Sequence, residues 1–275
     1  MILKDFDLRE IAYSGQCFRF TENPDSSFTF VVGDKIYTMK QEGDDVSGFS
    51  SDLSHYFDLE TDYGNIKKKL SEDPVLSDAI RSCPGMRILN QDFFETLISF
   101  IISQNNNIPR IKGLIKKISE KYGKEIENGI YSFPDPVTLS RCKAEELMEL
   151  KLGYRAEYIA ETAKRYVELG YHLEEDPKKK FLEDAEKSGI TPVEHLMSFK
   201  GVGPKVANCV ALFGLHLVDA FPIDVWVKRV MNRLYGIPEN NRREMEKFAE
   251  ENFSPYSGIA QQYLFFHIRN MEEIS

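Results

Sequence analysis

The chain has 275 residues, of which 42% are hydrophobic, 29% charged and 12% aromatic. This size and composition predict a globular protein and exclude disordered, fibrous and low-complexity classes. The longest apolar runs, residues 97–102 and 210–215, fall well short of the roughly 20 residues that cross a bilayer, and the first residues lack the basic start of a signal peptide. We therefore expect a cytoplasmic protein with no membrane association.

The formal net charge of −9 is unevenly distributed along the chain. Residues 1–100 hold 10 Lys and Arg against 18 Asp and Glu, whereas residues 101–275 hold 25 against 26. Residues 196–235 contain five basic and two acidic side chains, a local net charge of +3. Because salt limits the reach of a surface charge to about 10 Å, the local excess is compatible with a polyanion partner.

The four cysteines, Cys17, Cys83, Cys142 and Cys209, lie at least 59 residues apart. No CxxC pair exists, so the spacing does not indicate a zinc or iron–sulfur site. We expect no metal ligands and no resident cofactor.

The amino-terminal region has the alternating pattern of β-strands. Strands are predicted over residues 16–20, 27–32, 35–40 and 46–49, and Gly33-Asp34 is typical of a two-residue hairpin turn. From about Ile66 the apolar period becomes helical. The sequence therefore predicts an α+β fold, with an antiparallel β domain over residues 1–70 and a mostly helical region, in two subdomains, over residues 71–275.

Several helix boundaries are marked by capping residues. A polar stretch ends at Asn107, which is expected to cap a helix with Pro109 in its first turn. A further helix is predicted over residues 157–169. The charged run 174–180, which contains Pro177, fits either a solvated connection or a helix start.

The segment 191–209 predicts two helices joined by a glycine turn. Thr191 and Glu194 form a capping box that starts the first helix, and Pro204 opens the second. Gly201 and Gly203 permit a tight reversal that presents backbone N–H groups at a helix amino terminus, where a phosphate binds well. The glycine pattern alone favours an ordinary helical hairpin over a phosphate site.

Lys205 lies in the first turn of this second helix, where the helix dipole disfavours a positive charge. The dipole and burial both favour the neutral amine, which is a nucleophile. Asp224, 19 residues later, is predicted to cap the next helix. Capping is its simplest role, and the sharper hypothesis is that its carboxylate also lies close to Lys205 and stabilises positive charge on a reacting sugar.

Residues 201–205, Gly-Val-Gly-Pro-Lys, followed by Phe-Pro-Ile-Asp at 221–224, resemble the helix-hairpin-helix, Gly/Pro-rich loop and Asp signature of base-excision DNA glycosylases. The resemblance implies that Lys205 attacks the sugar in place of water and that Asp224 assists. Gly201 and Gly203 would then contact a DNA phosphate. The chain lacks the four-cysteine cluster usual in endonuclease III, and it is more similar to the 8-oxoguanine DNA glycosylases.

Three further segments carry that narrower resemblance. They are residues 14–20, 103–110 and 151–155. It implies that the Gly15 carbonyl accepts a hydrogen bond from N7–H of 8-oxoguanine, which guanine lacks. Asn105 would fill the gap left by the flipped base, and Tyr154 would act as a wedge. Arg110 and Arg155 would read the orphaned cytosine, whose exposed edge offers two acceptors.

A fourth segment, residues 257–265, resembles the carboxy-terminal pocket helix of the same family. Gln261 would bind the edge of the base, with Phe265 on one face and Cys209 on the other. Two positions depart from the larger members of the family. Phe213 stands in the pocket where those members have Met, and Trp226 stands where they have His.

The resemblance implies a monomeric enzyme that excises 8-oxoguanine opposite cytosine in duplex DNA and then nicks the abasic strand. Two alternatives stay open. The chain could excise another base, such as an alkylated purine, against which Gly15 and Gln261 argue. It could also be a noncatalytic DNA-binding hairpin protein, which Lys205 together with Asp224 disfavours. Taken singly, Gly15 fits a simple turn, Asn105 a polar loop and Phe265 a core position.

Overall fold

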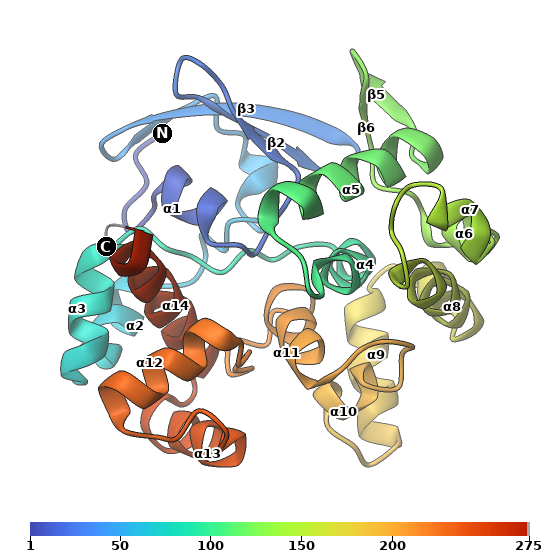
Figure 1. Ribbon diagram of the computed structural model, residues 1–275. Coiled ribbons are helices and arrows are strands. Elements are labelled where there is room, and N and C mark those ends of the chain that lie inside the picture. Colours follow the sequence, from blue (N-terminus) through green and yellow to red (C-terminus); the bar gives the residue numbers. More distant parts are fainter. Residues whose placement is uncertain (274–275) are drawn as a thin grey trace.

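The computed structural model describes residues 1–273 of the chain and the side chains of residues 1–269. A four-stranded antiparallel sheet, with α1 (Leu8–Tyr13) against it, lies at the top of Figure 1, and the helical region lies below. The expected α+β fold is confirmed. The last helix, α14 (Ser257–Glu273), returns to lie beside α1, where Arg269 donates a hydrogen bond to the carbonyl of Tyr13 at 2.8 Å.

The sheet has the simple strand order β1-β2-β3-β4. Val32 pairs with Lys35, so Gly33 and Asp34 form the expected two-residue turn, with Gly33 at φ +60°. The first strand begins at Phe20, four residues later than predicted, because residues 14–19 form a loop. The strands are β1 (Phe20–Glu22), β2 (Phe28–Val32), β3 (Lys35–Glu42) and β4 (Asp45–Ser47).

The helical region forms two groups that meet in one continuous core. One group combines helices from both ends of the region: α2 (Tyr63–Leu70), α3 (Pro74–Ser82), α12 (Val225–Tyr235), α13 (Arg242–Phe253) and α14. The other group contains α4 (Phe93–Ser103), α5 (Ile108–Tyr122), α6 (Pro136–Ser140), α7 (Ala144–Met148), α8 (Arg155–Glu168), α9 (Pro177–Lys187), α10 (Pro192–Leu196) and α11 (Pro204–Phe213). A short hairpin, β5 (Glu125–Glu127) and β6 (Ile130–Tyr131), follows α5, and 3-10 turns occupy Ser51–Leu53 and Tyr171–Leu173.

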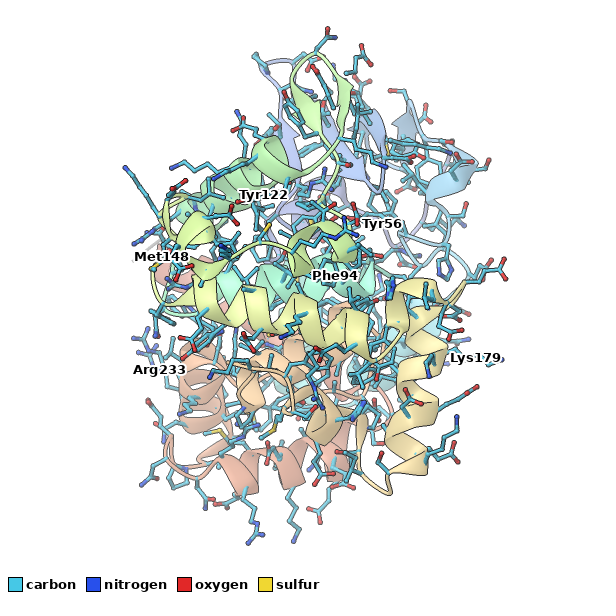
Figure 2. The ribbon with its side chains drawn as sticks, turned by 90° about the vertical axis from the view of Figure 1, so that its right-hand side faces the viewer. Tyr56, Phe94, Tyr122, Met148, Lys179 and Arg233 are labelled. Atoms are coloured by element: carbon cyan, nitrogen blue, oxygen red, sulfur yellow. The ribbon has the colours of Figure 1, made fainter. Side chains whose placement is uncertain are left out.

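The side view in Figure 2 shows α8 and α9 in front of the molecule. Phe94 on α4 lies inside the molecule, whereas Lys179 on α9 extends into solvent. Pro177 begins α9, so the charged run at 174–180 is a helix start. Among the described residues, no helix has the length and apolar character that spanning a membrane requires.

The predicted helix caps are present. The side chain of Asn107 accepts a hydrogen bond from the backbone N–H of Arg110 at 3.0 Å and so caps α5. Thr191 and Glu194 form the expected capping box at the start of α10. Each cap satisfies backbone groups that the first helical turn leaves unpaired.

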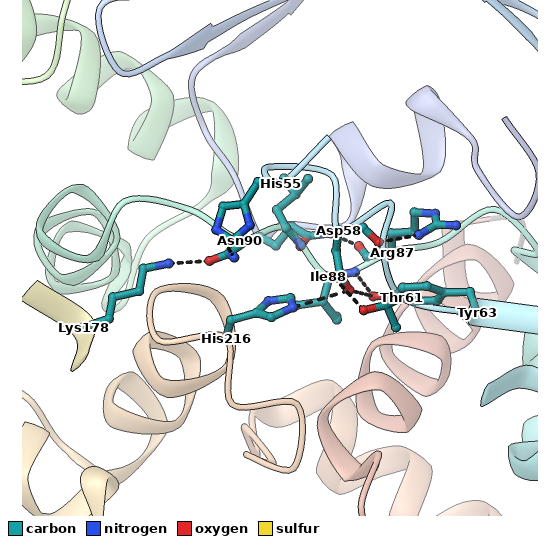
Figure 3. Close-up of polar contacts among 11 residues, drawn as sticks. His55, Asp58, Thr61, Tyr63, Arg87, Ile88, Asn90, Lys178 and His216 are labelled. Carbon is teal, nitrogen blue, oxygen red and sulfur yellow. Dashed lines mark hydrogen bonds and ion pairs between the residues drawn. The ribbon is translucent and has the colours of Figure 1, made fainter. Parts of the chain in front are cut away.

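The extended segment 86–91, here called the linking segment, connects α3 to α4 and is held by polar side chains (Figure 3). Arg87 donates to the carbonyls of Asp5 and Asp58, each at 2.7 Å. Asn90 forms hydrogen bonds with His55, from the loop after the sheet, and with Lys178, from α9. These contacts fix a stretch of chain that has no regular secondary structure.

Two hydrophobic cores divide the chain near the predicted domain boundary. The sheet core contains side chains from residues 3–57 and Leu89, while Tyr63 and Ile66 on α2 already belong to the helical core. The division into residues 1–70 and 71–275 stays a prediction.

Candidate active site

The two glycines of the hairpin between α10 and α11 differ in backbone conformation and in their surroundings. Gly201 has φ +76°, and a Cβ there would collide with the ring of Tyr158 on α8. Gly203 has an ordinary extended backbone, and a Cβ there would meet no protein atom within 4 Å. The fold itself therefore requires Gly201, while the open space at Gly203 leaves room for a ligand to approach the backbone at the start of α11.

Lys205 lies in the first turn of α11, as predicted, and is half-buried. Its Nζ lies 5.4 Å from the ring centroid of Phe100 on α4, within the range of a cation–π contact. One turn further along, Cys209 is buried. Burial raises the pKa of the Cys209 thiol, and the neighbouring Lys205 ammonium opposes that rise through its charge and a hydrogen bond.

Asp224 caps α12, because its Oδ1 accepts hydrogen bonds from the backbone N–H groups of Trp226 and Val227, each at 2.9 Å. Burial raises the pKa of this carboxyl, although the backbone donors and the charge of Lys205 pull it down. The carboxylate thus performs the capping role and also lies within electrostatic reach of the amine.

The loop that contains Gly15 is fixed to the linking segment by one buried glutamine. Gln16 is 1% exposed, and its amide donates to the Arg87 carbonyl at 2.8 Å and accepts from the Leu89 N–H at 2.7 Å. Gly15 itself has φ +80°, which glycine adopts without strain. The Gly15 carbonyl is therefore held in place by its neighbours.

The loop at Gly15 and helix α14 meet at Phe265. A Cβ built on Gly15 would lie 3.8 Å from Cε1 of the half-buried Phe265 ring. One turn earlier, Gln261 is 3% exposed, and its side-chain carbonyl accepts a hydrogen bond from Gln262 at 2.8 Å. Phe213, at the end of α11, is buried and stacks on Phe100, with ring centroids 5.5 Å apart and an interplanar angle of 19°.

The loop between α4 and α5 lies against the start of α8. Asn105, with φ +47°, donates a hydrogen bond to the hydroxyl of Tyr154 at 3.2 Å. Tyr154 is 48% exposed, and its ring packs edge-on against Tyr158, which also contacts Gly201. Tyr154 and Tyr158, at the start of α8, thereby connect Gly201 to the loop that contains Asn105.

The two arginines predicted to read a base lie in different environments. Arg110 is exposed, and its guanidinium has no partner among the described residues. Arg155 is 5% exposed and donates from Nε to the Gln104 carbonyl at 3.0 Å and from Nη2 to the Asn105 carbonyl at 3.2 Å. In this conformation Arg155 supports the loop from beneath.

Three residues that the sequence did not single out help to build this site. Phe100 lies under the Lys205 ammonium, Gln16 fixes the Gly15 loop, and Tyr158 sets the glycine turn. Phe100 is one apolar residue among many on α4, so its pattern carries no separate signal. Gln16 did offer one, because a polar residue inside an apolar stretch needs hydrogen-bond partners.

No group of three or more His, Cys, Asp or Glu side chains that could hold a metal ion occurs in the part of the chain that the structure describes. The chemistry available at the site is that of a half-buried amine, a half-buried carboxyl at a helix start and a buried thiol. A nucleophilic amine beside a carboxylate suits attack on an electrophilic carbon that develops positive charge.

Comparison with known proteins bears on the whole chain. Residues 2–97 match the family model of the 8-oxoguanine DNA glycosylase amino-terminal domain, and residues 98–255 match that of the HhH-GPD superfamily of base excision DNA repair proteins. A solved structure of a Clostridium acetobutylicum 8-oxoguanine glycosylase/lyase, in complex with double-stranded DNA containing cytosine opposite 8-oxoguanine, is 37% identical. The match covers 98% of this chain and 93% of that one, with a TM-score of 0.88.

Two curated relatives agree. An N-glycosylase/DNA lyase of Saccharomyces cerevisiae is 40% identical. The match covers 68% of this chain and 52% of the yeast protein, so the chain spans about half the length of that relative. A probable N-glycosylase/DNA lyase of Methanothermobacter thermautotrophicus is 32% identical over 79% of this chain and 74% of its own length. The chain therefore belongs to the HhH-GPD superfamily of base excision DNA repair proteins and carries the amino-terminal domain of the 8-oxoguanine DNA glycosylases.

Proposed function

We propose that this protein is a bifunctional DNA glycosylase that excises 8-oxoguanine from duplex DNA and then cleaves the abasic strand. The observation that carries the proposal is the position of Lys205, a half-buried amine between the Phe100 ring and Cys209 and within electrostatic reach of Asp224. A residue that only contacted a DNA phosphate would need exposure instead. The names of the relatives support the same activity.

The reaction begins once the damaged nucleotide has left the base stack, since C1′ is otherwise inaccessible. The neutral amine of Lys205 forms a bond to C1′, and the bond between C1′ and the base breaks, so the base leaves with the electron pair and takes up a proton. Asp224 stabilises the positive charge on the sugar. After the sugar ring opens, Lys205 and C1′ form a Schiff base. Loss of a C2′ proton then expels the 3′ phosphate.

Gly15 supplies selectivity for the oxidised base. Its carbonyl accepts a hydrogen bond from N7–H of 8-oxoguanine, whereas guanine presents an acceptor at N7 and leaves the carbonyl unpaired, which costs roughly 1–3 kcal/mol. Gln261 binds the opposite edge of the base, between Phe265 and Cys209. Because Phe265 packs against Gly15 in the free protein, its ring must move before a base can enter.

The DNA-binding face combines the hairpin with the Asn105 loop. The open backbone at Gly203 receives a phosphate at the start of α11, with Gly201 setting the turn. Asn105 and Tyr154 enter the duplex together, as their hydrogen bond indicates. Arg110 reads the orphaned cytosine directly, and Arg155 joins it after the loop carbonyls of Gln104 and Asn105 release its guanidinium.

Borohydride reduction in the presence of a duplex with 8-oxoguanine opposite cytosine tests the proposal. The parent protein forms a covalent adduct because borohydride reduces the Schiff base, and Lys205→Gln abolishes it. The matched control is Lys200→Gln, since Lys200 lies on the same hairpin, is exposed and pairs with Glu157 at 3.4 Å. Trapping that survives Lys205→Gln overturns the assignment of the nucleophile.

The trapping experiment and a comparison of base excision together separate the alternatives. A noncatalytic hairpin protein binds the duplex and gives no adduct. An enzyme for alkylated purines releases 3-methyladenine faster than 8-oxoguanine, which contradicts the role given to Gly15. The expectation that the protein is a monomer is independent of these outcomes and stays a prediction.

A further inference from the structure

A cavity of about 430 Å³ lies outside the candidate active site, between the sheet, α5 and the β5–β6 hairpin. Figure 1 shows these three parts side by side at the upper right of the molecule. Its walls are largely apolar, with Phe18, Phe20, Val31 and Ile130 among them. The volume is in the range of sites that hold small molecules.

One cation on the cavity wall lacks a counterion. Arg19 pairs with Glu95 at 2.9 Å, and Lys116 pairs with Glu120 at 3.7 Å, so both of these cations are compensated. Lys112 on α5 has no hydrogen-bond or ion-pair partner among the described residues, and its Nζ lies only 3.6 Å from the ring centroid of Phe20. An ammonium placed on an aromatic ring keeps N–H donors that the protein does not use.

Burial lowers the pKa of Lys112, because a charge in this half-buried position loses part of its hydration. A partly desolvated ammonium with unused donors is stabilised by an anion that enters the cavity. A single uncompensated charge suits a monoanion better than a phosphate dianion.

A second polar group on the same wall is unsatisfied. The hydroxyl of Ser119, on a residue that is 5% exposed, is buried with no hydrogen-bond partner. Ser119 follows Lys112 by seven residues, which is two helical turns, so both lie on the face of α5 that lines the cavity. The cavity thus offers an ammonium and a hydroxyl on one face of a helix, with apolar rings between and opposite them.

We propose that this cavity binds a small aromatic monocarboxylate, with the carboxylate at Lys112, the ring against Phe18 and Phe20, and a distal polar atom at Ser119. The site is separate from the proposed base pocket. It adjoins the active site through Phe18, whose ring packs edge-on against Phe100 at 5.7 Å between centroids.

Titration of the 275-residue chain with 4-hydroxybenzoate, followed by backbone amide chemical shifts, tests the proposal. The ligand is expected to shift amides of residues 18–21 and 112–119 at millimolar concentrations. The uncharged 4-hydroxybenzamide is expected to bind about tenfold more weakly, since a charge-assisted hydrogen bond is lost. Inorganic phosphate, which has no apolar part, is expected to leave these amides unchanged.

Two variants assign the contacts. Lys112→Gln should weaken 4-hydroxybenzoate binding about tenfold, while Lys117→Gln, on the same helix but outside the cavity lining, should bind like the parent. Ser119→Ala should fold normally, because its hydroxyl makes no bond to lose, and should bind a few-fold more weakly. Equal binding of the acid and the amide, shifts that map elsewhere, or unchanged binding by Lys112→Gln would each overturn the proposal. The proposal would also be overturned if Lys112→Gln bound DNA more weakly than the parent while the parent bound no carboxylate.

Discussion

The two walls of the candidate base pocket are built in different ways. The wall at Gly15 is fixed by hydrogen bonds, because Gln16 uses both ends of its buried amide to bond backbone groups of the linking segment. The wall on α14 is held mainly by packing: among the described residues, Gln261 bonds only its neighbour Gln262, and the side-chain carbonyl of Gln262 is buried and has no partner. We therefore expect the Gly15 wall to be rigid and the α14 wall to be adaptable.

The difference matches what each wall has to do in the proposed reaction. A carbonyl that distinguishes N7–H from a bare N7 must not turn away, because a mobile acceptor could find another donor and the discrimination would be lost. A ring that closes over an incoming base must first leave. The two groups to which these requirements apply, Gly15 and Phe265, are neighbours, since a Cβ on Gly15 would lie 3.8 Å from Cε1 of Phe265.

The largest expected effect comes from breaking the rigid wall. Gln16→Leu removes hydrogen bonds to the Leu89 N–H and the Arg87 carbonyl and leaves both buried, which should lower the free energy of unfolding by about 3 kcal/mol. The ratio of 8-oxoguanine to guanine excision should fall as well. Chemical denaturation and an excision assay on both substrates measure the two effects.

Gln262→Leu is the matched control in the adaptable wall. It leaves the buried Gln261 carbonyl without its donor but also removes the buried Gln262 carbonyl, which has no partner, so the two effects offset each other and the net cost should stay below about 1 kcal/mol. If Gln262→Leu destabilises the protein as much as Gln16→Leu does, the contrast between the walls is wrong.

The two arginines of the proposed DNA-binding face differ in the same way, because the Arg155 guanidinium is held by hydrogen bonds and the Arg110 guanidinium is exposed. Arg155→Met leaves the carbonyls of Gln104 and Asn105 without their donor and should cost about 2 kcal/mol of stability. Arg110→Met should change stability by less than about 0.5 kcal/mol, because its exposed side chain bonds no described residue. Both variants should lose preference for cytosine opposite the lesion. Thermal unfolding and excision opposite each of the four bases separate the two roles, and equal stability of the two variants would contradict the supporting role of Arg155.

The variant Phe265→Leu tests whether the ring on the α14 wall stacks on the base. Excision of 8-oxoguanine should fall about tenfold, since an aromatic face that stacks on the base is worth roughly 1–1.5 kcal/mol. Cleavage of a duplex that already contains an abasic site should be unchanged, because no base needs to be held. A parallel loss in both assays would show instead that Phe265 supports the position of Lys205.

The sequence was sufficient for the elements with local signals. The caps at Asn107 and Thr191, the turn at Gly33 and the order of sheet and helices follow from neighbouring residues, and the structure confirms them. The family resemblance is confirmed by the comparisons. The roles of Lys205, Asp224 and the pocket residues stay predictions, although the structure brings Lys205 within electrostatic reach of Asp224 and Gly15 close to Phe265.

What the sequence could not give depends on contacts between distant segments. The predicted strand at residues 16–20 is mostly a loop, because the side chain of Gln16 bonds a segment more than 70 residues away instead of pointing to solvent from a sheet. Arg155 was predicted as a second reader of the orphaned cytosine, and the prediction did not foresee that its guanidinium is buried under the loop of Asn105. Neither contact leaves a periodic trace in the chain, since each joins one side chain to backbone carbonyls or amides of another element.

The smallest predicted effect concerns the hydrogen bond between Glu10 on α1 and Gly85 in the turn after α3. Glu10 accepts a hydrogen bond from the Gly85 N–H at 2.7 Å, and burial together with the nearby Asp7 raises the pKa of Glu10 from 4.5 to about 7. The folded protein therefore binds this proton more tightly than the unfolded chain, so stability from Glu10 is present below pH 4.5 and is lost as the pH rises to about 7. Glu10→Gln keeps an acceptor for Gly85 and removes the charge. It should gain about 1 kcal/mol over the parent at pH 8, a value reduced for solvent screening at this partly exposed site, and should show no gain at pH 4. Urea denaturation at the two pH values gives the difference, and a gain of equal size at both would mean that α1 responds to the change in shape and not to the proton.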